Sequence, residues 1–455
     1  MIRTLTLVLT AGLLCASYGC AVEQAPDTPA AAKKVAFAVA SCTDADPAVA
    51  AKTAAEEAIE KLDCPAKGLI FYEYYPKTVQ DADGNDKEVP DAEKDKLVLP
   101  AIRGVAASIP VIGCRARSLV EDGTKLSDTV AVMAIGGEDV ACRAVKAELV
   151  TDRKAVGTAI AEGLKDVKDL KLVMALSEMN LSFDTTEGVS VEDFIRGALG
   201  AAGQEVTLFG GNCMPNDYPD DKGGVQFLDD EVLEGSVVAM GIGGPIAVHA
   251  NHTNEFALSE ETCTVTKAED KWILELDGEP AAEVYRRIRG MKPEDPFTSD
   301  SQHPIGVIVT EDEQKVYLRM VLEEDQQRGA LRFVAAVPEG TKVKILIGGF
   351  DAQAILDSAG EGITESLNKA GEEEPIVALL SDCCARGGRL RQFRQADECE
   401  VKLAILPAME KKGGKFPIFG FYAWGELGPI AGEFDGLPCM YQQHTFVSAV
   451  LTEEK

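Results

Sequence analysis

The most informative absences in this 455-residue chain concern metal ligands and membrane segments. Only four histidines are present, so a metal centre that needs several imidazole ligands is difficult to build. The sequence contains no Cys-x-x-Cys, no Cys-x-x-Cys-His and no Cys/His spacing of a zinc site. After the first 20 residues, no run approaches the ~20 apolar residues of a membrane span. We therefore predict a soluble or lipid-tethered mature protein without a resident cofactor.

Basic residues are also scarce. The chain has 45 Lys and Arg against 75 Asp and Glu, which gives a formal charge of −30. This excess argues against binding to nucleic acid or to anionic membranes by bulk attraction, because both are polyanions. The acidic residues are dispersed along the chain, and we interpret them as a solubilising surface rather than an acidic tail.

The N-terminus has the pattern of an export signal over residues 1–20. One positive charge is followed by an apolar core, Leu5 to Leu14, and then by small residues. Ser17-Tyr18-Gly19-Cys20 resembles a bacterial lipobox, which would make Cys20 a lipidation site; plain cleavage near Ala21 is the alternative. Residues 21–34, rich in Ala and Pro, are interpreted as a flexible tether. The pattern predicts an exported protein, either periplasmic or tethered to the outer membrane as a lipoprotein, that meets a membrane only through this anchor.

Three stretches of the chain repeat the same order of elements. In each, a short apolar strand is followed by a helical stretch and then by an apolar strand that runs into a glycine. Because matched units present matched loops, we expect Gly113, Gly210 and Gly420 to lie side by side at one rim of the fold. The closing strands are Ile109–Cys114, Val206–Gly211 and Phe416–Phe421.

The repeat predicts an α/β fold, with about three strand–helix–strand units forming mixed sheets flanked by helices. Between the second and third units, residues 262–337 alternate apolar and polar residues, as half-exposed antiparallel strands do. We take the third unit to begin with a strand over 342–347. A domain boundary near Gly278 gives an N-terminal domain over 35–279 and a C-terminal domain over 280–455. Apolar spacing of three and four predicts helices over 47–62, 153–164, 191–199 and 351–370.

The most specific motifs lie towards the C-terminal end. Ser381–Arg386 is similar to a Cys-x-x-Arg segment, Gly420–Pro429 to a Gly-Phe-x-x-x-Gly-Glu motif, and Gln442–Thr445 to a His-Asn-x-Thr segment in which Gln443 replaces the Asn. With these motifs the chain resembles the FIST family (F-box and intracellular signal transduction), with its N-terminal and C-terminal domains in order. The resemblance implies a sensory module that binds small ligands, amino acids among them. Some members of the family are haem-binding nitric-oxide sensors.

Arg386 and Glu426 are the sharpest candidates for ligand binding. Each comes just after an apolar strand, and if these strands are neighbours, both side chains face one crevice. A guanidinium group binds a carboxylate through a planar fork, and a carboxylate accepts an ammonium group. The pair therefore suits an amino acid or a small carboxylate. The alternative is a structural salt bridge between the two residues.

Other candidates surround this pair. Cys383 would be a nucleophile if Arg386 lowered its pKa, with simple packing as the alternative. Arg386, Arg389, Arg391 and Arg394 form either an anion site or an exposed loop that balances nearby acids. The residues that we expect to line the same crevice, or else to pack in the core, are Tyr422, Trp424, Gly420, Gly425, Cys114, Cys213 and Asn212.

The sequence thus predicts a non-enzymatic, small-ligand-binding sensory protein that acts through a separate signalling partner, because the chain carries no transmembrane, kinase or transmitter segment. Two alternatives stay open. One is a haem-dependent gas sensor in which His252 or His444 is a single axial ligand rather than an ordinary hydrogen-bonded histidine. The other is an enzyme that uses Cys383 or the Arg386–Glu426 pair.

Overall fold

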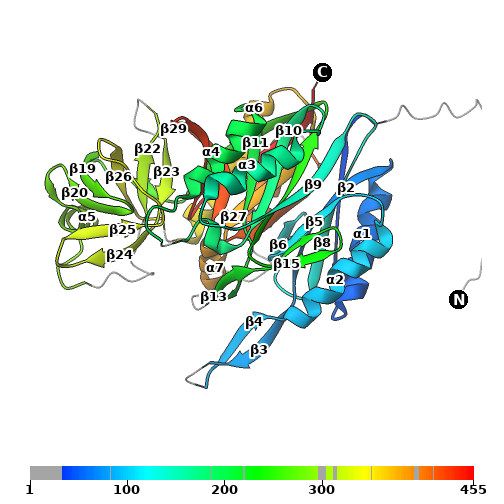
Figure 1. The fold of residues 1–455 in the computed structure, drawn as a ribbon, viewed down its shortest axis with the longest axis horizontal. Coiled ribbons are helices and arrows are strands. Elements are labelled where there is room, and N and C mark those ends of the chain that lie inside the picture. Colours follow the sequence, from blue (N-terminus) through cyan, green and yellow to red (C-terminus); the bar gives the residue numbers. More distant parts are fainter. Residues whose placement is uncertain are drawn as a thin grey trace, which may run out of the picture. The chain divides into compact units, whose positions relative to one another are not determined.

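Three six-stranded sheets form the centre of residues 33–455 in the computed structural model (Figure 1). The structure describes residues 33–81, 84–184, 186–218, 221–295, 304–310, 315–349, 351–393, 399–412 and 414–454. The predicted export signal with Cys20, nearly all of the tether, and Arg394 lie outside the described residues. Among the residues that are described, no helix combines the length and the apolar character that crossing a membrane would take.

The first unit shows how a strand–helix–strand sequence makes a mixed sheet. Its strands pair in the order β1-β8-β2-β5; β2 and β5 run parallel because helix α2 carries the chain back between them, and the other pairs are antiparallel. Helix α1 begins where predicted because Asp46 Oδ1 accepts a hydrogen bond from the Ala48 amide at 2.9 Å. The elements are β1 (Ala36–Thr43), α1 (Pro47–Leu62), β2 (Ala66–Tyr74), α2 (Ala92–Val105), β5 (Val111–Arg115) and β8 (Thr129–Gly136).

The second and third units repeat this topology, with strand orders β9-β16-β10-β11 and β17-β31-β27-β28. The predicted repeat and the α/β class are therefore confirmed. The second unit contains β9 (Ala141–Glu148), α3 (Arg153–Leu164), β10 (Leu170–Ser177), the 3-10 turn η1 (Met179–Leu181), α4 (Val191–Ala202), β11 (Thr207–Asn212) and β16 (Ser236–Gly243). The third contains β17 (Ile246–Thr253), α6 (Ala352–Ala370), β27 (Pro375–Cys383), α7 (Cys384–Phe393), the π-helical turn η2 (Val401–Ile405), α8 (Leu406–Lys411), β28 (Ile418–Ala423) and β31 (Phe446–Glu453).

The predicted first strand of the third unit is wrong. Residues 342–347 do form a strand, β26, but it pairs with other antiparallel strands and not with the third sheet. The first position of the third sheet belongs to β17, which pairs with β31. The sequence was misleading because β17 carries His249, Asn251 and His252 among its residues, whereas β26 is an apolar run directly before a helix.

Each unit also lends a hairpin to the sheet of another unit. The hairpin of the first unit pairs with β28, that of the second with β5, and that of the third with β11. The three exchanges close a cycle, so each sheet is extended at the edge of its third strand and this edge is not left open. The hairpins are β6 (Ser118–Val120) with β7 (Gly123–Lys125), β14 (Gln226–Leu228) with β15 (Glu231–Leu233), and β29 (Glu426–Phe434) with β30 (Leu437–Gln442).

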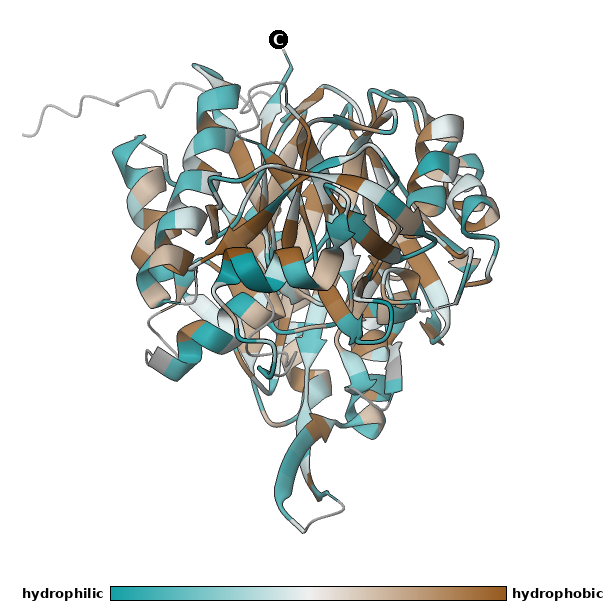
Figure 2. Cartoon of the chain, turned by 90° about the vertical axis from the view of Figure 1, so that its left-hand side faces the viewer, coloured by the Kyte–Doolittle hydropathy of each residue, from teal (hydrophilic) through white to brown (hydrophobic). Residues whose placement is uncertain are grey.

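The three sheets share one apolar core. Buried side chains from all three meet there, among them Tyr72, Met174 and Phe419, and the rings of Tyr72 and Phe419 stack at 4.6 Å. Helices cover the opposite faces: α1 and α2 the first sheet, α3 and α4 the second, and α6 the third. Figure 2 shows the apolar strands between helices whose other faces are hydrophilic, as the spacing of apolar residues predicted.

A nine-stranded antiparallel sheet is inserted between β17 and α6, which confirms the predicted antiparallel segment. The predicted domain boundary lies inside this sheet, because β21 (Glu279–Pro280) pairs with β20. Whether the chain divides there into independently folding parts stays a prediction. The other elements of the insert are β18 (Ala257–Leu258), β19 (Cys263–Glu269), β20 (Trp272–Leu276), α5 (Ala281–Arg289), β22 (Ile305–Ile308), β23 (Val316–Arg319), β24 (Val321–Asp325), β25 (Ala330–Phe333) and β26 (Lys342–Ile347). Two small hairpins are β3 (Pro76–Gln80) with β4 (Asp86–Pro90), and β12 (Pro215–Asp217) with β13 (Asp221–Gly224).

The three glycines of the repeat are not turn residues. Gly113, Gly210 and Gly420 lie inside β5, β11 and β28, the third strand of each unit. What meets at one place is the set of strand ends beyond them. The amide of Tyr422 donates to Arg117 O at 2.9 Å, and the amide of Asn212 donates to Gly425 O at 3.0 Å. The expected convergence therefore involves the residues after the glycines.

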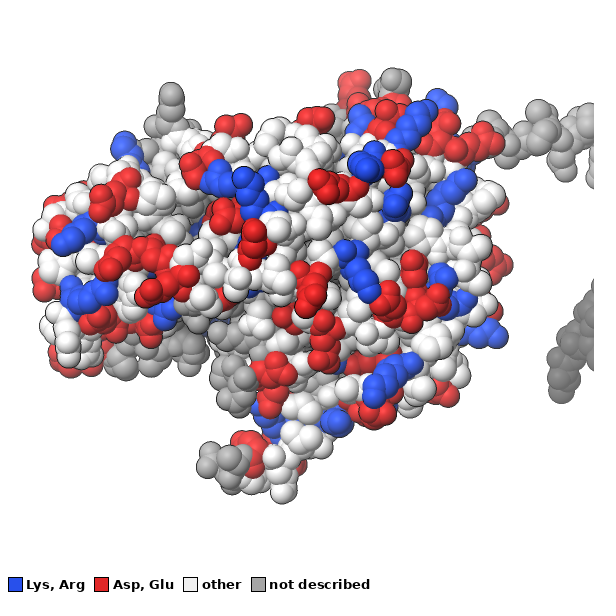
Figure 3. Space-filling model, viewed as in Figure 1, with Lys and Arg blue, Asp and Glu red and all other residues white. Residues whose placement is uncertain are grey.

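The surface charge follows the dispersed pattern of the sequence. On the face shown in Figure 3, acidic and basic side chains are interleaved and do not gather into one patch of a single sign. Many of the pairs are exposed, such as Arg143 with Asp166 at 3.1 Å, and exposed pairs contribute little to stability.

Candidate functional site

A pocket of about 330 Å³ lies where the carboxyl ends of the parallel strand pairs converge. Every unit contributes to it through residues just beyond its strands, because the exchanged hairpins and the backbone hydrogen bonds hold these ends together. The residues that line the pocket are Arg117, Met179, Phe183, Met214, Tyr218, Met320, Cys383, Cys384, Ala385, Arg391, Tyr422, Trp424, Gly425, Gln443 and His444.

The walls of the pocket are largely apolar. Met179, Met214 and Met320 supply flexible thioether side chains, which adapt to the shape of a ligand. The rings of Tyr218 and Trp424 lie 4.9 Å apart at an angle of 48°. Aromatic and thioether walls of this kind favour a flat apolar group.

Three N–H donors of pocket residues are buried and have no hydrogen-bond partner among the described residues. They are Arg117 Nε, Arg391 Nη1 and Trp424 Nε1. Arg391 packs over the Tyr422 ring at 5.4 Å. A buried donor without a partner costs about 1–3 kcal/mol, so an acceptor that entered the pocket within reach of these groups would be stabilised there.

Asn212 holds the turn that carries Trp424 through hydrogen bonds to its backbone. Asn212 Nδ2 donates to Trp424 O at 3.0 Å, and the amide of Trp424 donates to Asn212 O at 3.1 Å. Ser177 Oγ in turn donates to Asn212 Oδ1 at 2.8 Å. Asn212 was expected in the wall of the crevice; it lies behind the wall and fixes the position of the tryptophan.

Gly425 is required by the same turn. Its φ is +132°, and a Cβ at this position would lie 2.8 Å from Asn212 Nδ2 and 2.9 Å from Ser182 Oγ. We expect Gly425→Ala to destabilise the protein by about 1–3 kcal/mol in urea unfolding, because the strained backbone and the contact act together. Gly436→Ala is the control, since it has φ +73° but nothing within 4 Å of the added carbon. If both variants lose the same amount of stability, the close contact with Asn212 does not contribute to the loss in Gly425→Ala.

The structure does not bring Arg386 and Glu426 together, and neither lines the pocket. The guanidinium of Arg386 is fully enclosed: Nε donates to Asp382 Oδ1 at 2.7 Å, and Nη1 donates to Ser358 Oγ at 3.0 Å and to Glu255. Nη2 donates to the carbonyl oxygen of residue 355 at 3.1 Å. The prediction that this pair faces one crevice is therefore wrong, and so is the alternative of a direct salt bridge.

Glu426 belongs to a separate buried network. Its Oε2 accepts hydrogen bonds from the Thr445 amide at 3.1 Å and from Thr445 Oγ1 at 2.7 Å. Burial raises the pKa of Glu426 well above its usual range, and the neighbouring Cys383 adds to this effect. Burial thus disfavours the charged form of Glu426, and Thr445 rather than a ligand occupies its Oε2.

Cys383 does not have the environment of a nucleophile. The hydrogen bond with Cys384 and burial raise the pKa of the Cys383 thiol well above its usual range. Arg386 was expected to lower this pKa, but its donors are taken up by Asp382, Ser358 and Glu255. Cys383 lies in the pocket wall as a neutral thiol.

Two family models match the chain in succession. The model of the FIST N domain matches residues 88–279, and the model of the FIST C domain matches residues 281–429. The chain belongs to the FIST family. FIST domains are described as sensory modules that bind small ligands in signal transduction.

Curated relatives of this FIST protein carry no functional name. It is 27% identical over 215 residues to the uncharacterized protein Rv0628c of Mycobacterium tuberculosis, with 45% of this chain and 52% of that protein aligned. It is 28% identical over 179 residues to the uncharacterized protein Mb0898c of Mycobacterium bovis, with 37% and 42% aligned. The chain spans about half the length of the curated relatives it matches.

Similarity to solved structures is weak. The FIST chain aligns with cyanuric acid hydrolase from A. caulinodans at a TM-score of 0.35 and 9% identity, covering 92% of this chain and 100% of the other. It aligns with a chorismatase at a TM-score of 0.31 and 11% identity, covering 92% and 98%. Both TM-scores are too low to establish a shared fold.

The remaining candidates of the FIST protein divide into pocket and core residues. Tyr422, Trp424 and Gly425 line the pocket with Cys383, and the Tyr422 hydroxyl donates to Glu400 Oε2 at 2.7 Å. Cys114 and Cys213 instead belong to the central core, where their side chains are neighbours. Gly420 packs inside β28 against Leu380.

The two histidines also differ. His444 lines the pocket. His252 does not; its Nε2 lies 3.0 Å from Val316 O, and it is buried. Only His444 is therefore placed where a pocket ligand would meet it.

His444 should make stability depend on pH. Burial, together with the nearby Arg389 and Arg386, lowers the pKa of His444 from 6.5 to about 4. The unfolded chain therefore binds a proton between pH 6.5 and 4 that the folded state does not, so stability is lost as the pH falls through this window. A pKa shift from 6.5 to about 4 corresponds to at most about 3–4 kcal/mol of stability.

The measurement is urea unfolding of the wild type and His444→Asn between pH 7 and pH 4. Asn tolerates the positive φ of +57° at this position and does not titrate. We expect the wild type to lose stability relative to the variant as the pH falls. A difference that stays constant across the window would contradict the prediction.

Most residues of the pocket wall were not predicted from the sequence. Arg117 follows β5, Met179 and Phe183 follow β10, and Met214 and Tyr218 follow β11. The signal available for these residues was their position just beyond a strand of a repeated unit. Nothing in the sequence indicated the one contribution from the inserted sheet, Met320, because it depends on how that sheet packs against the units.

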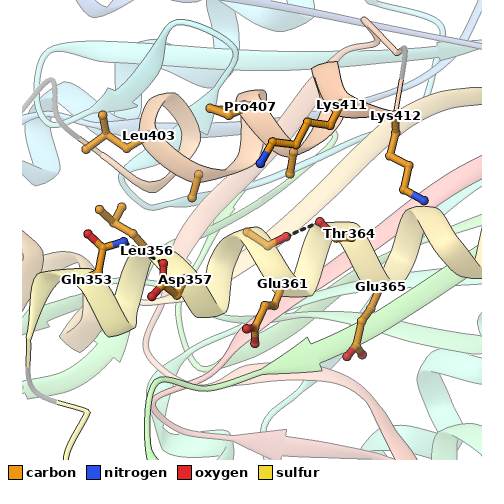
Figure 4. Close-up of a pocket in the computed structure, with 13 residues that line it drawn as sticks. Gln353, Leu356, Asp357, Glu361, Thr364, Glu365, Leu403, Pro407, Lys411 and Lys412 are labelled. Carbon is orange, nitrogen blue, oxygen red and sulfur yellow. Dashed lines mark hydrogen bonds between the residues drawn. The ribbon is translucent and has the colours of Figure 1, made fainter.

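A larger hollow of about 680 Å³ lies between α6 and the η2–α8 segment (Figure 4). Its wall combines Leu356, Leu403 and Pro407 with charged side chains, and Figure 4 shows Glu361 and Glu365 pointing away from α8. Among its described lining residues, no buried polar atom lacks a partner. Its size alone therefore does not make it the better candidate.

Proposed function

We propose that this FIST protein is the ligand-binding part of a signalling system, and that its ligand, an amino acid or a small carboxylate, binds in the pocket at the converging strand ends. The family description supports the sensory role. The pocket supports the binding site, because it lies at the carboxyl ends of parallel strands, where ligands of α/β proteins commonly bind.

The three unpartnered donors carry the proposal. Arg117 Nε, Arg391 Nη1 and Trp424 Nε1 are all buried on residues that line this pocket. A carboxylate supplies two oxygens with about four lone-pair sites, which is enough to accept from all three donors. Charge-assisted hydrogen bonds from arginine are roughly twice as strong as neutral ones. A small anion thus removes the cost of the unsatisfied donors and gains further stabilisation.

The size and walls of the pocket fit a small molecule. Its volume of about 330 Å³ is at the lower end of the range of about 300–1,000 Å³ for ligand pockets. Apolar walls with a few fixed polar groups are typical of such sites, because the walls supply affinity and the polar groups set orientation.

The test is a thermal-shift screen of amino acids and small carboxylates, followed by titration calorimetry of the hits. A ligand at 100 times its Kd stabilises the fold by roughly 2.7 kcal/mol, which a melting curve detects readily. Ala385→Leu narrows the pocket and should abolish the shift in melting temperature. Ala404→Leu fills the larger hollow between α6 and the η2–α8 segment and should leave that shift unchanged. The reverse result would place the ligand in the larger hollow beside α6. If none of the compounds shifts the melting temperature, the proposal is contradicted.

The signalling role requires a partner protein, and we propose that this partner meets the protein outside the cytoplasm. The proposal rests on the signal-like residues 1–20 and on the lipobox-like Ser17 to Cys20. We expect the native chain to begin at Cys20, with a lipid, or at Val22. Mass spectrometry of the protein purified from its native source decides between these outcomes, and an intact Met1 would contradict export.

A further inference from the structure

The pocket presents donors but no acidic side chain. Among its described lining residues, the charged groups are Arg117 and Arg391, and no Asp or Glu is present. This is notable in a chain of formal charge −30, where a random surface would be acidic. The local field therefore attracts an anion and repels a cation.

Two of the buried acids beside the pocket accept hydrogen bonds or ion pairs from their neighbours. Glu255 accepts from Arg386 and lies 3.9 Å from the ring of His444, which is a pocket residue. Glu426 accepts from Thr445 directly after the pocket residue Gly425. Both acids are buried, and neither lines the pocket. Single oxygens of Glu426, Glu400 and Asp382 have no hydrogen-bond partner, but none of these acids lines the pocket, so the wall itself offers an ammonium group no carboxylate.

Neutral acceptors of the wall are also engaged. Gln443 Oε1 accepts from the Met320 amide at 3.4 Å, and Trp424 O accepts from Asn212 Nδ2 at 3.0 Å. Arg117 O accepts from the Tyr422 amide at 2.9 Å. These bonds occupy part of the acceptor capacity that the three N–H groups of an ammonium ion would need.

We infer that the pocket selects an aromatic monocarboxylate and discriminates against the amino acid of the same skeleton. This inference rests on the proposed function and narrows it. The carboxylate lies against the donors of Arg117, Arg391 and Trp424, and the ring lies between the thioether and aromatic walls. An α-ammonium group would be buried beside two arginines without a partner, which weakens binding.

The experiment compares three probes by titration calorimetry with the full chain: 3-phenylpropanoate, L-phenylalanine and 2-phenylethylamine. All three contain a phenylethyl group. 3-phenylpropanoate adds a carboxylate, L-phenylalanine adds a carboxylate and an ammonium group, and 2-phenylethylamine adds an ammonium group alone. We expect 3-phenylpropanoate to bind at least about tenfold more tightly than L-phenylalanine, and 2-phenylethylamine to show no binding. Trp424→Phe keeps the ring but removes one donor, and it should weaken 3-phenylpropanoate by about tenfold.

The outcomes separate this inference from the proposed function. L-phenylalanine could bind as tightly as 3-phenylpropanoate, with both losing affinity in Ala385→Leu. That result overturns the inferred selectivity but keeps the pocket as the ligand site. Binding of 3-phenylpropanoate that Trp424→Phe does not weaken overturns the assignment of the donors. Failure of all three probes, while another amino acid shifts the melting curve, also overturns the inference but not the proposed function.

Discussion

Replacing Arg386 by methionine is expected to destabilise the folded protein by about 3–5 kcal/mol. The guanidinium is fully buried and binds Asp382 and Glu255, which are also buried. These acids hold the pKa of Arg386 above its usual range although burial opposes this, so the arginine stays charged. Without it, the two carboxylates lose their counter-charge in a medium of low dielectric constant. Urea unfolding at pH 7 measures the loss.

The control is Arg143→Met, which breaks an exposed pair with Asp166 and should cost less than about 1 kcal/mol. The deficit of Arg386→Met should shrink as the pH falls, because burial raises the pKa values of Asp382 and Glu255 and protonation removes the uncompensated charge. If the variant does not fold at pH 7, adding Asp382→Asn and Glu255→Gln should restore folding. A loss no larger than that of Arg143→Met would show that the enclosed arginine is dispensable.

The second large effect concerns the ligand. Removing both arginine donors of the pocket, in the variant Arg117→Gln with Arg391→Gln, should weaken 3-phenylpropanoate by at least about 100-fold. Each hydrogen bond to a charged group contributes about 1.5–3 kcal/mol, and two such bonds are lost. Stability should change little, because Arg117 pairs with the exposed Glu88 and packs over the Tyr74 ring, and Arg391 packs over the Tyr422 ring. Calorimetry gives the affinity, and a melting curve checks the fold first.

The control is Arg143→Gln, which removes one arginine that does not line the pocket and makes the net charge more negative by one, half the change in the double variant. It should leave the affinity within a factor of about two, since long-range effects of exposed charges are screened by salt. An equal loss in the control and in the pocket variant would mean that bulk charge, and not the geometry of the donors, governs binding.

The α/β character and the repeat could be read from local sequence because they depend on local chemistry. Helices α1 and α3 begin and end at the predicted residues, since caps such as Asp46 and Asp152 lie directly before them. Strands β2, β10 and β27 were predicted from short apolar runs, which are likewise a local feature of the sequence. Helix α7 was not predicted, because its start is rich in Arg and contains Gly387 and Gly388, which lower helix propensity.

The site could be predicted only as a region. The repeat pointed to the end of β28, where Tyr422 lies in the strand, Trp424 and Gly425 directly follow it, and all three line the pocket. It failed for Arg386 and Glu426, because the position of a residue after a strand does not tell whether its side chain turns toward the pocket or into a buried network. That choice is made by Glu255, which lies 131 residues from Arg386, and by Thr445, which lies 19 residues from Glu426, directly before β31.

The sequence by itself determined the class of fold, the threefold repeat, the antiparallel insert and the FIST family, because strands, helices and motifs are written in neighbouring residues. Tertiary structure decided which unit each hairpin joins, where β17 pairs, and which donors are left without partners. Hydrogen-bond satisfaction is a property of all groups that surround an atom, and these groups come from every unit. The pocket with Arg117, Arg391 and Trp424 therefore exists only once the three sheets have assembled.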